Sequence, residues 1–223
     1  MSIRLIFLFF LLIIINNIYT QEQDFQLWIG LEARAPIKNK FSISLENEKR
    51  FYENASIYGR NQTDLGLGYD INRIFSISAS YRMNYYYPFT ELVYSKSRWT
   101  SSFYYTSRYK RWRFNVRLRV SNDSETYVPG WFEQRVLHRE RFRALYNFRK
   151  SPFRVHASAE TYFPISYNSF ELRKIRIITG VQIRAIENHR FGVDYVYDKE
   201  FNSNNALTAH IIQFSYRYSL SDF

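Results

Sequence analysis

Apolar and polar residues alternate along most of the chain after residue 20. In the segment RFNVRLRV, residues 113–120, every second residue is apolar and the others are arginine or asparagine. Because successive side chains of a strand point to opposite faces, this period of two predicts a β-strand with one apolar and one polar face. Such a strand suits a soluble sheet with its apolar face on a core. It equally suits a transmembrane barrel with that face on lipid.

Segments with this period recur to the C-terminus. We expect strands at 25–34, 41–51, 63–71, 74–83, 98–109, 113–120, 135–148, 153–163, 172–186, 191–197 and 207–220. Most are close to or above the 9–11 residues that a tilted strand needs to cross a bilayer, whereas strands of soluble proteins average about 5–6. Short links near 36–40, 72–73, 110–111, 149–152 and 187–189 alternate with longer ones at 52–62, 84–97, 121–134, 164–171 and 198–206. This alternation is typical of barrels with short periplasmic turns and longer extracellular loops.

These patterns predict an all-β protein, a single closed antiparallel up-and-down transmembrane β-barrel. The polar faces carry Ser, Thr, Asn, Gly and many Arg rather than the Lys and Glu of a soluble surface, which favours a wet lumen. Eleven segments are counted, but bacterial single-chain barrels have even strand numbers. We therefore expect 10–12 strands and slightly prefer twelve.

The first twenty residues resemble a secretory signal peptide. Arg4 is followed by the apolar run Leu5–Ile15, which is too short for a transmembrane helix. We therefore expect residues 21–223 to form an exported barrel domain in the outer membrane of a Gram-negative bacterium, and the terminal Phe223 resembles the assembly signal of such barrels. The formal charge of +11 permits anionic partners, and the absence of cysteine excludes disulfides, a thiol nucleophile and a lipoprotein anchor.

Arginines form rows on the polar faces of two neighbouring segments. The candidates for an anion-binding lumen are Arg113, Arg117, Arg119, Arg139, Arg141 and Arg143. Like charges on paired strands are destabilising, so a compensating acidic wall is expected. It would consist of Glu46, Glu48, Asp64, Asp70 and Glu160. The lumen would then attract small anionic solutes; the alternative is a salt-bridged plug that conducts nothing.

A second candidate site is the sequence His156-Ala157-Ser158-Ala159-Glu160. His156, Ser158 and Glu160 share one strand face and contain the residue types of a hydrolase triad. The His-x-Ser pair resembles that of outer-membrane lipid A deacylases, but here it faces the expected lumen. The structural alternative is a polar ladder. The remaining histidines have no metal-ligand spacing, so we expect no metal and no cofactor.

Three stretches carry a resemblance to a known family. They are LWIGLE with Trp28, ENEKRFYEN at 46–54, and RNQTDLGLGYDINRIFSISASYR at 60–82. They resemble the DUF2490 family of Bacteroidetes outer-membrane β-barrel-like proteins. The resemblance covers about the first third of the chain and implies the barrel fold, with no catalytic residues.

We expect a non-enzymatic outer-membrane barrel, a narrow or plugged channel or an envelope structural protein. Its partners would be the lipid bilayer and lipopolysaccharide, with small anionic solutes and without nucleic acid. Two alternatives stay open: an outer-membrane lipid hydrolase using the His-x-Ser pair, and a soluble periplasmic barrel that binds an apolar ligand with its faces reversed. The sequence specifies neither the solute nor the oligomeric state.

Overall fold

The structure is a computed structural model that describes residues 23–38, 40–87, 94–124, 134–166, 169–201 and 207–220. The expected signal peptide and the terminal Phe223 lie outside these residues. Within them, no helix is long and apolar enough to cross a membrane.

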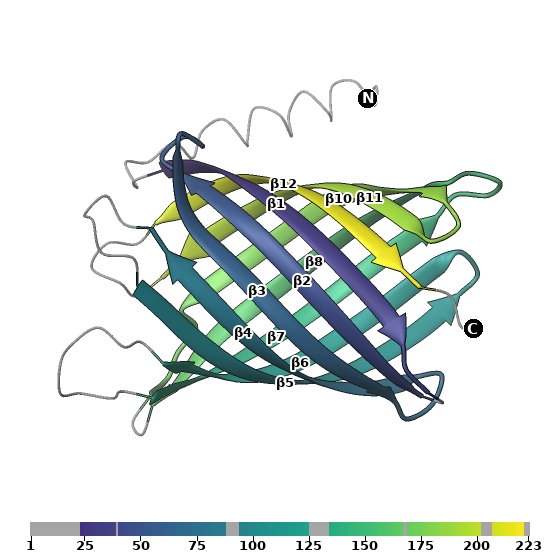
Figure 1. Cartoon of the computed structure of the whole chain (residues 1–223), viewed down its shortest axis with the longest axis horizontal. Helices are drawn as coiled ribbons and strands as arrows, with labels where there is room; N and C mark the ends of the chain where they lie inside the picture. The colour runs from purple at the N-terminus through teal and green to yellow at the C-terminus, as the bar shows by residue number, and fades with distance from the viewer. Residues whose placement is uncertain are drawn as a thin grey trace, which may run out of the picture.

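The described strands form one closed sheet, and Figure 1 shows them tilted around a barrel. The strands are β1 (Gln23–Pro36), β2 (Phe41–Tyr52), β3 (Ile57–Asp70), β4 (Phe75–Tyr86), β5 (Tyr94–Tyr109), β6 (Trp112–Ser124), β7 (Gln134–Asn147), β8 (Phe153–Ser166), β9 (Ser169–Phe170), β10 (Lys174–Ile186), β11 (His189–Glu200) and β12 (Thr208–Ser219). The two-residue β9 pairs only with the end of β8, and β8 itself pairs directly with β10. The described residues therefore form eleven long strands of 12–16 residues each.

The barrel closes through a parallel pair. β1 pairs with β12 in parallel from Gln23 opposite Thr208 to Arg34 opposite Ser219, and every other long pair is antiparallel. A ring of purely antiparallel strands needs an even number, so one parallel pair is what allows eleven. The predicted closed barrel of 10–12 strands is confirmed: the described residues form eleven long strands rather than the slightly preferred twelve, and the parallel β1–β12 pair is the one departure from the predicted antiparallel arrangement.

The links separate two ends of the barrel. Turns after β1, β3, β5, β7 and β10 form the short-turn end, and β4, β6, β8 and β11 end at the opposite, long-link end, where β1 begins. The expected long link at 52–62 is wrong, because β3 begins at Ile57. Glu53, Asn54 and Ala55 adopt left-handed backbone angles (φ 51°, 58° and 61°), which allow the chain to reverse within four residues.

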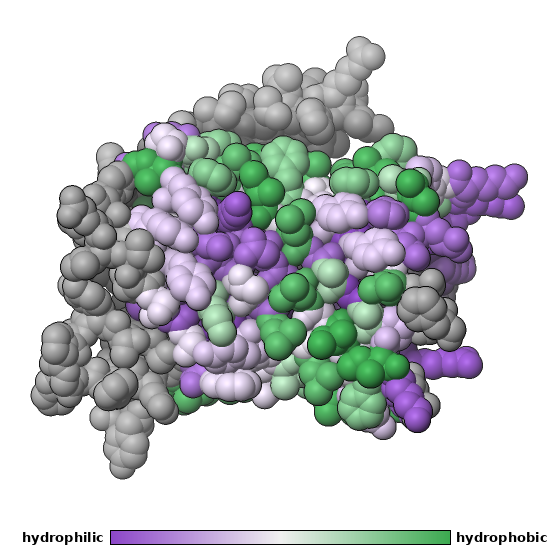
Figure 2. Space-filling model, viewed as in Figure 1, coloured by the Kyte–Doolittle hydropathy of each residue, from purple (hydrophilic) through white to green (hydrophobic). Residues whose placement is uncertain are grey.

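Apolar side chains cover the outside of the barrel. Leu31, Leu45 and Phe142 each expose more than half of their surface, and Figure 2 shows apolar residues over much of the visible wall, with strongly hydrophilic ones projecting at the short-turn end. A soluble barrel with its apolar faces inside is therefore not the arrangement in this structure. The outside suits hydrocarbon, as in outer-membrane barrels.

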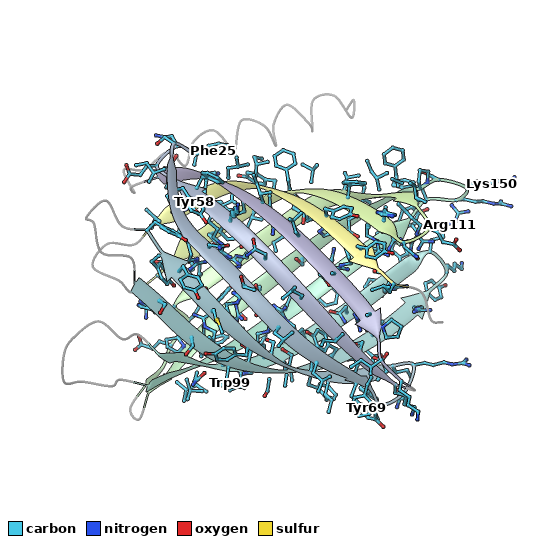
Figure 3. All side chains as sticks on the ribbon, in the orientation of Figure 1. Phe25, Tyr58, Tyr69, Trp99, Arg111 and Lys150 are labelled. Atoms are coloured by element: carbon cyan, nitrogen blue, oxygen red, sulfur yellow. The ribbon has the colours of Figure 1, made fainter. Side chains whose placement is uncertain are left out.

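Aromatic residues gather on the outer face near both ends. Phe41 and Tyr69 pack with ring centroids 4.7 Å apart at the short-turn end, and Tyr58 and Tyr87 stack at 4.8 Å at the long-link end. Figure 3 labels Tyr58 and Tyr69 at these opposite ends. Two belts of aromatic residues, one near each end of the barrel, are typical of barrels that anchor in both membrane interfaces.

A small polar cluster interrupts the apolar outside. Asn47 on β2 donates to the side-chain oxygens of Asn61 and Thr63 on β3, at 2.9 Å each. These groups satisfy one another, which lowers the cost of placing them on a lipid-facing wall.

Candidate functional site: an arginine-lined lumen

The polar faces of all eleven long strands enclose one cavity of about 1760 Å³. Its lining reaches from Arg73 and Arg108 near the short-turn end to Arg60, Arg173 and Glu200 near the long-link end. The lining includes eighteen arginines and two lysines but only seven carboxylates. The lumen is thus a wet interior with a large excess of positive charge.

All six arginines proposed from the sequence line this cavity. On the paired strands β6 and β7, Arg117 lies directly opposite Arg141, and Arg119 opposite Arg139. Arg113 lies opposite Leu145, and Arg143 opposite Asn115. The predicted adjacency of the two rows is confirmed. We name Arg117, Arg119, Arg139, Arg141 and Arg143 the inner cluster.

Glu160 on β8 is the carboxylate that contacts the inner cluster. It lies opposite Arg141, forms an ion pair with Arg117, and accepts a hydrogen bond of 2.8 Å from the Tyr162 hydroxyl. Only 3% of Glu160 is exposed. Arg119 instead donates to Ser102 at 3.0 Å, and Arg141 to Asn115 at 3.3 Å.

The inner cluster keeps donors without partners in the described structure. The Nε atoms of Arg117, Arg139, Arg141 and Arg143 are buried and bond to no described group. Buried donors and uncompensated buried charges are both costly. One glutamate beside five guanidinium groups leaves positive charge and N–H donors unbalanced, so the inner cluster is suited to bind a further anion.

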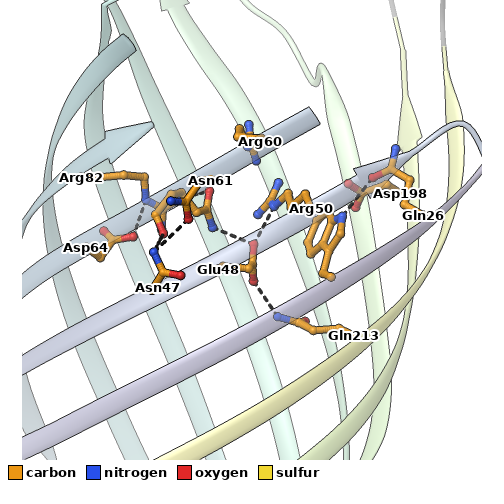
Figure 4. A network of polar contacts seen from close by, with 12 residues as sticks. Gln26, Asn47, Glu48, Arg50, Arg60, Asn61, Asp64, Arg82, Asp198 and Gln213 are labelled. Carbon is orange, nitrogen blue, oxygen red and sulfur yellow. Dashed lines mark hydrogen bonds and ion pairs between the residues drawn. The ribbon is translucent and has the colours of Figure 1, made fainter. Parts of the chain in front are cut away.

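The acidic wall expected on the early strands is largely neutralised by its own arginines. Glu48 accepts from Arg50 at 2.6 Å, and Asp64 accepts from Arg82 at 2.5 Å. Glu48 also accepts hydrogen bonds from Gln62 on β3 and from Gln213 on β12, which lies on the other side of β1, as Figure 4 shows. The residues face the lumen as expected, but their pairing weakens any transverse field against the inner cluster.

A stack of alternating guanidinium groups and rings lies in the long-link half of the lumen. We name it the cation–π ladder, and it consists of Arg50, Trp28, Arg176, Tyr162 and Arg139. The Arg50 guanidinium carbon lies 3.5 Å from the Trp28 ring centroid, and that of Arg176 lies 5.0 Å from it. Arg176 also lies 5.5 Å from the Tyr162 ring, and Arg139 lies 5.2 Å from it.

The ladder is fixed at its middle and at its base. Arg176 makes a two-pronged ion pair with Asp198, at 2.6 and 2.7 Å. The Trp28 indole nitrogen donates to Gln26, and the buried Val196, Ala209 and Ile211 cluster with the Trp28 ring. Cation–π pairs strengthen when they are desolvated, so this stack is a rigid obstruction on one side of the lumen.

Sequence reasoning did not identify the ladder. Trp28 was noted only for its family-like surroundings, although it shares a strand face with the polar Gln26 and Glu32. A bulky aromatic residue on the polar face of an alternating strand is the signal that could have marked it. The remaining members lie on β2, β7, β8 and β10, and only the closed barrel brings them together.

The wall formed by β2, β3 and β4 is lined by small side chains in the short-turn half. The cavity lining there includes Ser42, Ser44, Gly66, Gly68, Ser76, Ser78 and Ser80. The side chains on this wall are small, whereas the ladder in the other half of the lumen is bulky. We name the short-turn half of the lumen the vestibule.

The hydrolase candidates face this lumen but do not form a relay. His156 lies 3.4 Å from Asp194, whereas Glu160 is engaged by Arg117 and Tyr162. Gly180 makes the first contact possible, since a Cβ there would lie 2.7 Å from the Val193 carbonyl oxygen and would also overlap Asp194. His156, Ser158 and Glu160 are all buried inside the barrel, away from the lipid that a deacylase must reach.

The comparisons with known proteins give one family match. The family model described as "Protein of unknown function (DUF2490)" matches residues 25–208. The chain belongs to the DUF2490 family. This match extends the resemblance seen in the first third of the chain to most of the barrel of this DUF2490 protein.

No curated protein matches this DUF2490 chain significantly. Among solved structures it is similar to the β-domain of the Bordetella autotransporter BrkA. That similarity has 13% sequence identity and a TM-score of 0.45, and it covers 81% of this chain and 83% of the other.

Proposed function

We propose that this DUF2490 protein is an outer-membrane barrel of a Gram-negative bacterium that acts as a narrow channel for small anions. The observation that carries the proposal is the large cavity of about 1760 Å³, whose lining among the described residues reaches toward both ends and holds twenty cationic but seven acidic residues. A pore lined by arginine attracts anions and repels cations. The role is non-enzymatic, and the channel's surroundings are the lipid bilayer and lipopolysaccharide.

The placement in a membrane is supported by the outside of the barrel. Its strands are long enough to cross a bilayer, its outward side chains are mostly apolar, and aromatic residues lie near both ends. In water, the same surface would be a large exposed apolar patch and a site of aggregation.

The cation–π ladder supports a narrow channel rather than a wide pore. Trp28 and Tyr162 are each less than 10% exposed, and the guanidinium groups between and beside them fill space that water and solutes would otherwise occupy. We therefore expect small conductance steps, well below those of large porins, and passage restricted to small solutes.

The proposal is tested by conductance in planar bilayers after the protein is recovered from outer-membrane fractions. A salt gradient should produce a reversal potential that indicates anion selectivity. The variant Arg141→Glu, inside the lumen, should lower that selectivity, whereas Arg149→Glu, on the exposed turn after β7, should leave it nearly unchanged. A folded barrel that is electrically silent, or that prefers cations, would overturn the proposal.

A further inference from the structure

Four arginines gather near the short-turn end of the lumen, outside the inner cluster. We name them the mouth cluster: Arg113 on β6, Arg154 on β8 and Arg190 on β11, which line the cavity, and the exposed Arg184 on β10. Arg184 and Arg190 lie directly opposite each other in the sheet, and Arg154 lies on the strand that pairs with β10. Arg154 lies opposite Gln182, so it is a diagonal neighbour of Arg184, a position from which long side chains can reach each other.

None of the four has a hydrogen-bonded or ion-paired side-chain partner among the described residues. The Nε atoms of Arg113 and Arg190 are buried without an acceptor, and Arg154 is only 7% exposed. Of the nearby carboxylates, Glu32 pairs with Arg217 at 2.6 Å, and Asp194 lies 3.4 Å from His156 rather than in an ion pair with any of the four. Like charges gathered in this way are unfavourable unless something anionic joins them.

Guanidinium geometry indicates the kind of anion. Each arginine presents a planar fork of N–H donors that fits two oxygens of one phosphate or carboxylate group. Several forks around one space suit a group with two charges and three terminal oxygens, which is the description of a phosphate monoester. Chloride or a single carboxylate would satisfy fewer of these donors.

The opposite wall of the vestibule suits a hydroxylated body. β3 lies about half-way round the barrel from β8 and β10, and its neighbours contribute Ser42, Ser44, Ser76 and Ser78 to the cavity lining. Gly66 and Gly68 add no side chains to this wall, and the hydroxyls of Ser44 and Ser42 pack directly against them. A solute with hydroxyl groups could exchange hydrogen bonds with this wall while its phosphate rests on the arginines.

We infer that the vestibule binds a small hydroxylated phosphate monoester, with the phosphate on the mouth cluster and the hydroxyls toward the serine wall. This inference rests on the proposed function, since it names the class of solute that enters the channel from the short-turn end. Binding is non-covalent, and no bond is made or broken.

Titration calorimetry of the folded full barrel in detergent tests the site, with glucose 6-phosphate as the probe. Binding should be saturable and tighter than for glucose or inorganic phosphate. Arg154→Gln and Arg190→Gln should each weaken it about ten-fold or more. Arg149→Gln makes the same charge change on an exposed turn and should alter affinity less than about two-fold. Heat-modifiable migration verifies the fold of each variant, and Arg113→Gln replaces any that fails.

Equal weakening by Arg149→Gln, or a glucose 6-phosphate affinity no higher than that of inorganic phosphate, would overturn the inference. Chloride conductance separates this failure from failure of the channel. An anion-selective current that glucose 6-phosphate does not block leaves the channel standing and removes the site. A silent barrel that still binds the probe keeps the site and removes the channel.

Discussion

The orientation of the two barrel faces can be tested at a single depth with neighbouring residues. Ala79 and Ser80 lie at the middle of β4, next to each other. Ala79 is exposed and lies on the strand face of Ile77, opposite Leu67, whereas Ser80 is half-buried and lies on the face of Ser78, opposite Gly66. Arginine introduced at either position adds the same charge and volume at the same depth, so any difference in stability reports the environment of the face.

The expected magnitudes follow from the surroundings. At position 79 the guanidinium would lie near the bilayer midplane, which costs about 2–4 kcal/mol in the free energy of folding. That cost corresponds to a folding constant lower by about thirty- to nine-hundred-fold. At position 80 the new charge enters a wet cavity. The nearest cation on that strand face, Arg82, is already paired with Asp64, so we expect a cost of about 1 kcal/mol or less.

The assay is urea unfolding of Ala79→Arg and Ser80→Arg after refolding into phospholipid vesicles, followed by tryptophan fluorescence. Ala79→Arg should unfold at clearly lower urea than the parent, and Ser80→Arg close to it. If Ser80→Arg were the more damaging variant, the apolar face would be the interior one, and the assignment of lipid and lumen would be refuted.

Three further substitutions test the interior. Glu160→Gln removes the carboxylate that contacts the inner cluster and should destabilise the barrel by about 3–5 kcal/mol, measured by urea unfolding; a loss below about 1 kcal/mol would show that Glu160 does not carry the charge balance. Trp28→Leu removes the ring between Arg50 and Arg176 and should enlarge single-channel conductance in planar bilayers, and unchanged steps would mean that the ladder is not the constriction. Ser158→Ala should leave the acylation of lipid A unchanged when lipid A is examined by mass spectrometry, and an altered profile would revive the hydrolase.

The strands and their faces could be predicted from the sequence because a strand repeats every two residues. Alternation in residues 113–120 was enough to put Arg117 and Arg119 on one face, and the next segment placed Arg139 and Arg141 beside them. These relations involve two strands that follow each other in the chain and pair as neighbours, so they can be predicted without knowledge of the whole ring.

The β1–β12 pair and the cation–π ladder depend on contacts between residues far apart in sequence, which a local sequence pattern cannot predict. Whether β1 meets β12 in parallel is decided by how the two ends of the sheet meet, and the evenness of other barrels suggested the opposite. Trp28 and Arg176 lie far apart in sequence and on strands that are not hydrogen-bonded to each other. The tight reversal at 53–56 was likewise missed, because left-handed angles at Glu53 and Ala55 are unusual for those residue types.

The parallel seam has a consequence for how the chain is threaded. Because β1 and β12 run the same way, the start of the barrel and its finish lie at opposite ends. If the short turns face the periplasm, as the proposed placement implies, Gln23 would lie on the cell-surface side and Ser219 on the periplasmic side. The first residue of β1 would then have to cross the bilayer before β1 can pair with β12 and close the barrel.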